Sequence, residues 1–166
     1  MSRIVVGVVA LAAFALLVAS PVSATTPRYS LSGVETGVPQ SAGGGESTSA
    51  FAGTAFSWSA GPATWSAHVT HRSLAACATL GNACITGGSL KLSGVHTVSG
   101  TFSNGSINLV SGNPVTCTST SVYRVTGLVA LVGGGTATFT ARLTHYQVKL
   151  FGSCVPYFAT VSGTFG

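Results

Sequence analysis

Carboxylates are the scarcest functional groups in this chain of 166 residues, which contains no Asp and only two Glu, Glu35 and Glu46. Glycoside hydrolysis generally needs two carboxylates beside the bond that breaks, and a Ser-His-Asp triad needs an acid behind its histidine. Calcium loops depend on several acidic side chains. The sequence therefore argues against all three kinds of site.

Several ligand-binding motifs are also missing. The sequence has no phosphate-binding loop and no dinucleotide fingerprint, so it predicts no cofactor. It also lacks the Gly-x-Ser-x-Gly elbow that holds the nucleophile of many hydrolases. The formal net charge is +5. However, its cations form no run and do not alternate with aromatic residues, whereas a nucleic-acid module would show a basic stripe. We therefore expect no nucleic-acid partner, and an anionic surface or an extracellular ligand remains open.

Long apolar runs are confined to the start of the chain. Arg3 precedes an apolar run from Ile4 to Ala19, and Val22-Ser23-Ala24 is a small-residue cleavage site. At 16 residues the run is shorter than the roughly 20 that span a membrane. This pattern predicts a signal peptide at 1–24 rather than a membrane helix, and hence a secreted chain.

Beyond the signal no window has a sustained helical period, and alternation of period two predicts strands instead. The clearest case is Val122–Phe165, which we interpret as two hairpins. A turn at 133–135 would place Val129 opposite Phe139 and Tyr123 opposite His145. After His145 the apolar set changes parity, which predicts a bulge. The second turn is expected at Gly152-Ser153.

The remaining strands complete an all-β prediction. Residues 25–50 are expected to form a strand followed by a flexible Gly/Ser/Pro-rich segment, and 51–166 a single β domain. Asn104-Gly105 is a strong hairpin signal, and Ser73–Gly88 is expected to be an irregular loop. The total is eight to nine antiparallel strands, arranged as an up-and-down barrel or a sandwich.

Two segments recur within the chain. Ala137–His145 matches Ala63–His71 without a gap, with five identical positions, and Thr160–Phe165 repeats Thr97–Phe102 letter for letter. The matches occur in the same order. We therefore predict an internal two-fold repeat with units at about 51–111 and 122–166.

Four cysteines follow the signal, and in an exported chain they predict two disulfides. Cys77 and Cys84 lie in one loop. The hairpin register brings Cys117 close to Cys154. The favoured pairs are Cys77–Cys84 and Cys117–Cys154.

Candidate site residues face the expected barrel interior. An apolar ligand would be lined by Trp58, Trp65, Tyr123, Phe139 and Tyr146, although ordinary core packing also accounts for these aromatics. His71 and His145 are equivalent positions of the repeat, each ending an apolar run. Two such imidazoles could bind zinc or copper, or each could cap a strand by hydrogen bonding to a loop.

The expected function follows from these features. The sequence predicts a secreted, disulfide-stabilised β domain that acts without catalysis, by binding or as a structural surface component. The alternatives are a barrel that carries a small apolar ligand and, with less support, a metalloprotein or enzyme built on His71 and His145. A cavity of several hundred cubic ångströms in the interior would favour the carrier, and a solid core the structural protein.

Overall fold

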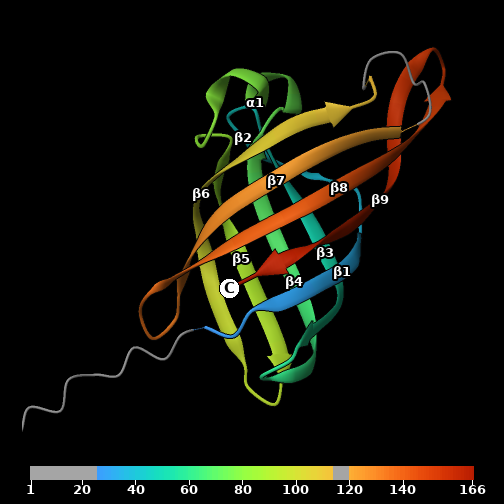
Figure 1. The fold of residues 1–166 in the computed structure, drawn as a ribbon. Coiled ribbons are helices and arrows are strands. Elements are labelled where there is room, and N and C mark those ends of the chain that lie inside the picture. Colours follow the sequence, from blue (N-terminus) through green and yellow to red (C-terminus); the bar gives the residue numbers. More distant parts are fainter. Residues whose placement is uncertain (1–25, 114–119) are drawn as a thin grey trace, which may run out of the picture.

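A computed structural model describes residues 26–113 and 120–166, and only the backbone at 153–157 (Figure 1). Nine strands and one helix make up this part of the chain. They are β1 (Tyr29–Glu35), β2 (Gln40–Gly43), β3 (Glu46–Ser57), β4 (Gly61–Arg72), α1 (Leu74–Leu80), β5 (Ile85–Gly94), β6 (Val98–Ser111), β7 (Thr120–Leu131), β8 (Thr136–Leu150) and β9 (Ser153–Phe165). The predicted signal peptide and Cys117 lie outside the described residues. Within them, no helix has the length and apolar character to cross a membrane.

The strands form a closed antiparallel barrel. Each strand from β3 to β8 pairs with the next one in the sequence, and β1 closes the ring by pairing with both β9 and β3. β2 pairs only with β3 and stands outside the ring of eight. An eight-stranded barrel is just wide enough for side chains to fill it or for one small ligand to enter it. The all-β prediction is confirmed, and the architecture is the barrel rather than the sandwich.

The barrel has two different ends. Figure 1 shows α1 and the β8–β9 turn at one end, which we call the helix end. The turns after β3, β5 and β7 lie at the other, which we call the turn end. His71 and His145 lie toward the helix end of their strands. Trp65 and Phe139 lie six residues closer to the turn end.

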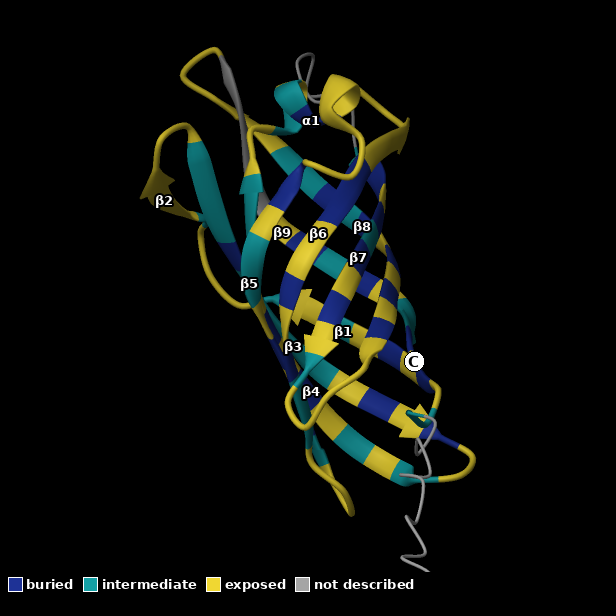
Figure 2. Ribbon diagram, turned by 90° about the vertical axis from the view of Figure 1, so that its left-hand side faces the viewer, coloured by how far each residue is buried: buried dark blue, intermediate teal, exposed yellow. Residues whose placement is uncertain are grey.

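Alternating side chains separate the interior from the solvent. In β8, Ala137, Phe139 and Ala141 are buried, whereas Thr136, Thr138 and Thr140 between them are exposed. Figure 2 shows the same alternation of buried and exposed positions along neighbouring strands. This pattern is expected of a strand with one face on a core and one in water.

The register of the first hairpin differs from the predicted one by two residues. Val129 pairs with Ala137 and Tyr123 with Leu143, because the loop extends over 131–135, where Gly135 O accepts from Leu131 N at 3.1 Å. A two-residue shift leaves every side chain on its predicted face, whereas a one-residue shift would exchange the faces. The core set was therefore predicted correctly despite the wrong partners.

The second turn is also displaced. Leu150 pairs with Ser153, so the turn residues are Phe151 and Gly152, with φ of 50° and 84°, rather than Gly152 and Ser153. The expected irregularity after His145 is present, since the register shifts between Tyr146 and Gln147.

The hairpin predicted at Asn104-Gly105 is wrong. β6 runs through this dipeptide as one strand, with a register shift between Phe102 and Asn104. A Cβ on Gly105 would clash with the carbonyl oxygen of Thr126 and lie 2.7 Å from Ile85 Cδ1. The glycine is needed here for close backbone approach inside the barrel, not for a turn.

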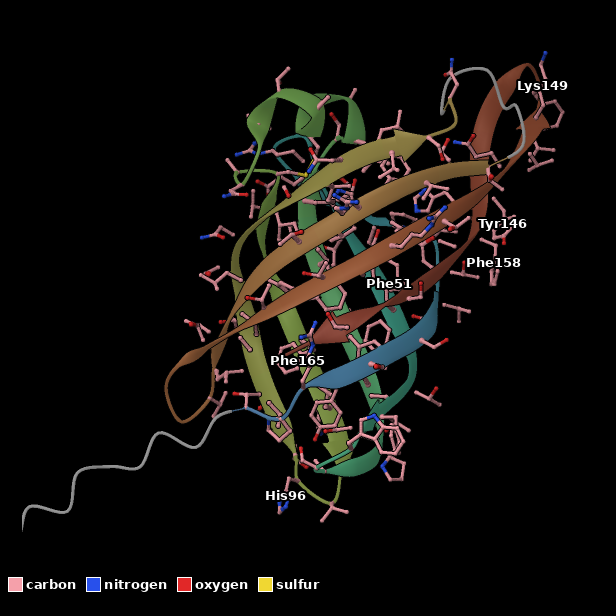
Figure 3. The ribbon with its side chains drawn as sticks, viewed as in Figure 1. Phe51, His96, Tyr146, Lys149, Phe158 and Phe165 are labelled. Carbon is pink, nitrogen blue, oxygen red and sulfur yellow. A yellow bond between two sulfur atoms is a disulfide. The ribbon has the colours of Figure 1, made fainter. Side chains whose placement is uncertain are left out.

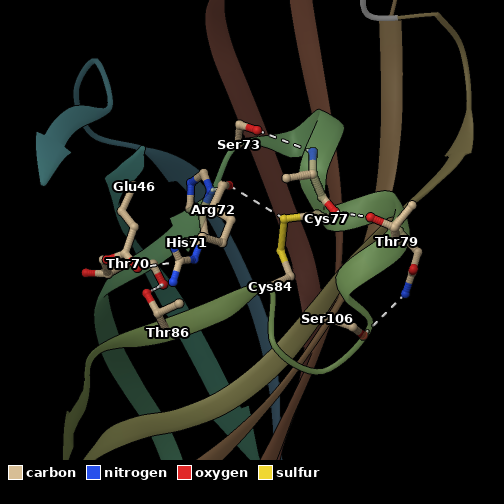
Figure 4. Close-up of a disulfide and its surroundings, with 12 residues drawn as sticks. Glu46, Thr70, His71, Arg72, Ser73, Cys77, Thr79, Cys84, Thr86 and Ser106 are labelled. Atoms are coloured by element: carbon tan, nitrogen blue, oxygen red, sulfur yellow. Dashed lines mark hydrogen bonds and ion pairs between the residues drawn. A yellow bond between two sulfur atoms is a disulfide. The ribbon is translucent and has the colours of Figure 1, made fainter. Parts of the chain in front are cut away.

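The prediction of an irregular loop at Ser73–Gly88 is wrong, because this segment contains α1 and its last residues already belong to β5. The Ser73 hydroxyl accepts from Ala76 N at 3.3 Å and so caps the helix. The predicted Cys77–Cys84 disulfide ties the helix to the start of β5 (Figure 4). The predicted Cys117–Cys154 pair lies outside the described residues. The segment expected to be flexible holds β2 and the first residues of β3.

The two matching segments lie on opposite walls of the barrel. Ala63–His71 lies in β4 and Ala137–His145 in β8, four strands apart around a ring of eight. Trp65 and Phe139, at equivalent positions, are both buried, and their ring centroids are 6.3 Å apart. The second match lies on β6 and β9, which run in opposite directions. The internal repeat is therefore not shown and stays a prediction.

Candidate ligand-binding site

A cavity of about 210 Å³ occupies the barrel interior toward the helix end. Its walls come from β3, β4, β6, β7, β8 and β9, with Pro39, Ser73 and Leu74 at the helix end. The apolar lining consists mainly of Phe51, Val69, Ile107, Val125, Phe139, Ala141, Leu143 and Val161. The polar lining beside it consists of Ser47, Ser49, His71 and His145. A mostly apolar pocket with a few polar groups is typical of small-molecule sites.

Hydrogen bonds fix the ring of His71 at the cavity wall. Its Nδ1 lies 2.8 Å from the carbonyl oxygen of Arg72, and its Nε2 lies 3.3 Å from Ser49 Oγ. Because a carbonyl oxygen can only accept, Nδ1 carries the proton and donates it. Nε2 makes the second hydrogen bond of the ring, with the Ser49 hydroxyl. Both nitrogens of His71 thus have protein partners.

His145 is on the opposite wall and differs in this respect. Its side chain is only 7% exposed and lines the cavity, and its ring contacts Tyr123 edge-on with centroids 5.5 Å apart. Neither of its nitrogens has a hydrogen-bond partner among the described residues. Burial lowers the pKa of His145, and its Coulombic interaction with His71 lowers it further. At neutral pH His145 is an uncharged imidazole with one donor and one acceptor available to the cavity.

Glu35 adds a carboxyl group on the inner face of the barrel. It is the cross-strand partner of Phe51, which lines the cavity, so both side chains point inward. Burial raises the pKa of Glu35, and the Ser49 hydroxyl partly offsets that effect. Its Oε1 is buried without a hydrogen-bond partner among the described residues. A negatively charged ligand group close to Glu35 and Ser49 is therefore disfavoured.

The predicted lining residues have three different positions. Phe139 borders the cavity. Trp65 and Tyr123 are buried in the interior but contribute to the core rather than to the lining. Trp58 and Tyr146 lie away from the interior. Trp58 is 95% exposed because it follows the last residue of β3, and Tyr146 packs on Phe158 outside the barrel (Figure 3).

The predicted histidines share one cavity but do not assemble a metal centre with other residues. No group of three or more His, Cys, Asp or Glu that could hold an ion occurs in the described ranges 26–113 and 120–166. Each nitrogen of His71 is also engaged in a hydrogen bond. The metal hypothesis gains no support from this geometry.

Three residues of the site were missed by sequence reasoning. Ser49 and Phe51 occur at the border of a Ser/Gly-rich segment and Glu35 at the end of β1, so no alternation marked them. Only pairing across strands would have identified these residues, because Glu35 pairs with Phe51, and Ser49 with Val69. A single sequence does not reveal such pairs.

Comparison of the chain with protein-family models, with curated proteins and with solved structures finds no match, so its function has to be inferred from its own residues.

Proposed function

We propose that the helix-end cavity binds one small, mostly apolar molecule that carries a single neutral polar group. The observation that carries this proposal is His145, a polar side chain only 7% exposed that lines the cavity without a hydrogen-bond partner among the described residues. A polar group at the wall of a mostly apolar cavity is stabilised by a hydrogen-bond partner, and a ligand hydroxyl would supply one. The function is therefore that of a small-ligand carrier or receptor.

The volume sets the size of the ligand. An engineered cavity of roughly 150 Å³ is enough for benzene, whereas pockets for drug-sized molecules span roughly 300–1,000 Å³. At about 210 Å³ this cavity suits one substituted ring or a short branched chain. Glu35 and the uncharged His145 both favour a neutral alcohol or phenol over a carboxylate.

A titration with three probes tests the proposal. We expect para-cresol to bind in the cavity, with chemical shift changes in nuclear magnetic resonance spectra centred on Phe51, Ala141 and His145. Toluene should bind about fivefold more weakly, because it lacks a hydrogen bond worth about 1 kcal/mol. Benzoate should bind most weakly of the three. Binding of benzoate above para-cresol would contradict the assigned polarity.

Matched variants locate the binding site. Ala141→Leu fills the cavity and should abolish binding of both para-cresol and toluene. Ala130→Leu adds the same side chain at an exposed position of β7 and should leave binding unchanged. His145→Phe should bring para-cresol down to the affinity of toluene. Binding that survives Ala141→Leu would place the ligand elsewhere and overturn the proposal.

We also propose that the protein is exported and binds its ligand outside the cell. The apolar run at Ile4–Ala19, the small-residue site at Val22–Ala24 and the Cys77–Cys84 disulfide support this. N-terminal sequencing of the protein recovered from culture medium should begin at Thr25. Retention in the cell with Met1 intact would contradict it.

One observation favours a second candidate function, ester hydrolysis at Ser49. Ser49 Oγ, His71 Nε2 and the Arg72 carbonyl form a nucleophile, a base and an orienting acceptor in sequence. Ser49 would attack the ester carbonyl while its proton moves to His71, the ester C–O bond would break, and the departing alcohol would take that proton. Water would then hydrolyse the acyl group from Ser49. Cleavage of para-nitrophenyl acetate that Ser49→Ala abolishes would support it, and equal rates for both proteins would exclude it.

A further inference from the structure

Two arginines lie directly opposite each other on the outer face of the barrel. Arg124 of β7 and Arg142 of β8 are cross-strand partners. Their neighbours Tyr123, Val125, Ala141 and Leu143 are buried, so the two arginines, which are exposed, point outward. Like charges directly opposite each other in an antiparallel pair destabilise a sheet. A bound anion would offset this repulsion.

The described residues provide no carboxylate to do so. Their one ion pair joins Arg72 to Glu46, with Nε and Oε1 3.3 Å apart. Glu35, the other acidic side chain of the sequence, points into the barrel toward Ser49, and the wall separates it from the outer face. Neither Arg124 nor Arg142 has a hydrogen-bond or ion-pair partner among the described residues. Both guanidinium groups are therefore available to a ligand.

A surface hollow of about 280 Å³ contains the pair. Its polar lining consists mainly of the two arginines, Thr140, Ser162 and Thr164, and Val110 and Val122 are among its apolar residues. Ser162 pairs with Arg142 on β9, and all three hydroxyl residues are on the same outer face. Two guanidinium groups with hydroxyl donors beside them match the several acceptor oxygens of a tetrahedral oxyanion.

We propose that Arg124 and Arg142 form a binding site for a phosphate or sulfate group, independent of the interior cavity. The two arginines grip separate oxygens of the anion, and Ser162 and Thr140 donate to the others. The group is either a free ion or a substituent of an anionic polymer. The cations are dispersed along the sequence, and only the pairing of β7 with β8 brings these two together.

Calorimetric titration at low ionic strength tests the site with inorganic phosphate, inorganic sulfate and a sulfated tetrasaccharide. Arg124→Gln and Arg142→Gln should each weaken binding at least about tenfold, since each removes charge-assisted hydrogen bonds. Arg28→Gln, which removes an exposed arginine elsewhere, is the matched control and should change affinity less than twofold. Binding of the free ions as tight as that of the tetrasaccharide indicates a free-ion site, and binding of the tetrasaccharide alone indicates a substituent.

Thermal unfolding provides a second readout. Without added anion at low salt, Arg142→Gln should raise the melting temperature, because the repulsion is gone. Inorganic phosphate should raise the melting temperature of the wild type but not of the variant. Failure of all three anions to bind, or equal weakening by Arg28→Gln, overturns the proposal.

Discussion

At the turn end, aromatic rings fill the barrel interior, whereas at the helix end the same strands enclose a cavity of about 210 Å³. Phe139 contacts Phe102 edge-on at 5.7 Å and Trp65 at 6.3 Å, and Phe165 beside them is fully buried (Figure 3). At the helix end the corresponding positions of β4 and β8 are His71 and His145. The difference shows that one half of the interior is packed and the other half is left open.

Side-chain size explains why one barrel holds both halves. An eight-stranded barrel is filled only where large side chains meet from opposite walls. Trp65 faces Phe139 across the interior, but near the helix end Ala141, Val69 and Ser49 leave the space between the walls open. Substitutions made separately in the filled half and at the cavity test whether the two halves differ in packing.

The largest effect is expected from truncation in the filled half. Phe102→Ala should lower the free energy of unfolding by about 3–5 kcal/mol, as for a fully buried aromatic. Phe51→Ala at the cavity should cost only about 1–2 kcal/mol, because Phe51 is half-buried and already borders empty space. Urea unfolding measures both. Equal costs would remove the distinction between the halves.

The disulfide should matter chiefly at the helix end. Cys77 and Cys84 are separated by seven positions, and Cys77→Ser with Cys84→Ser should cost about 2–3 kcal/mol through loop-closure entropy. Hydrogen exchange should show protection lost in α1 and the adjoining ends of β4 and β5. Protection near Trp65 and Phe165 should persist. Uniform loss along the barrel would contradict this division.

Enlarging one alanine in each half gives a matched pair on β8. Ala137→Leu, in the filled half, should destabilise the protein by about 1–3 kcal/mol through overpacking. Ala141 lines the cavity, so Ala141→Leu should leave the free energy of unfolding unchanged or raise it by up to about 1 kcal/mol. Thermal and urea unfolding of the two variants test this. A larger penalty for Ala141→Leu would indicate that the cavity is not open.

The smallest effect is the dependence of stability on pH. The folded pKa of His145 is lowered, so below about pH 6.5 the unfolded chain binds more protons than the folded one. Stability should therefore decrease as the pH falls through about 6.5 and level off below the folded pKa of His145. His145→Asn should flatten this slope, whereas the exposed His96→Asn should not.

Glu35 changes the dependence of stability on pH in the opposite direction to His145. Its folded pKa is raised, so stability is lost as the pH rises from its ordinary value of 4.5 toward the folded value. Glu35→Gln should thus stabilise the protein at neutral pH and change little below pH 4.5. A destabilising effect of Glu35→Gln at neutral pH would contradict the assigned burial.

Much of the fold could be predicted because the alternation of residues such as Ala137, Phe139 and Ala141 depends only on which face is buried. The residues that pair across strands could not be predicted, since a two-residue shift of register preserves that alternation. Asn104-Gly105 misled because a turn and a close backbone approach require the same small residue. Helix α1 was missed because it is one short helix held by a cap and a disulfide.

The site was predicted less well than the fold. His71 and His145 were chosen from their equivalent positions, and both line the cavity. The two arginines of the outer face were considered dispersed, because cross-strand pairing is not visible in the sequence. Trp58 was predicted to line the cavity because it is aromatic. It is exposed because it follows the last residue of β3.

A crystal structure of the protein with para-cresol tests the central claim most directly. The ring should lie between Phe51, Ala141 and Leu143 at the helix end, with the phenol oxygen within hydrogen-bond distance of a nitrogen of His145. The interior at the turn end, around Trp65 and Phe102, should remain filled by protein. Para-cresol bound only on the outer surface, or side chains closing the space beside His145, would contradict the account.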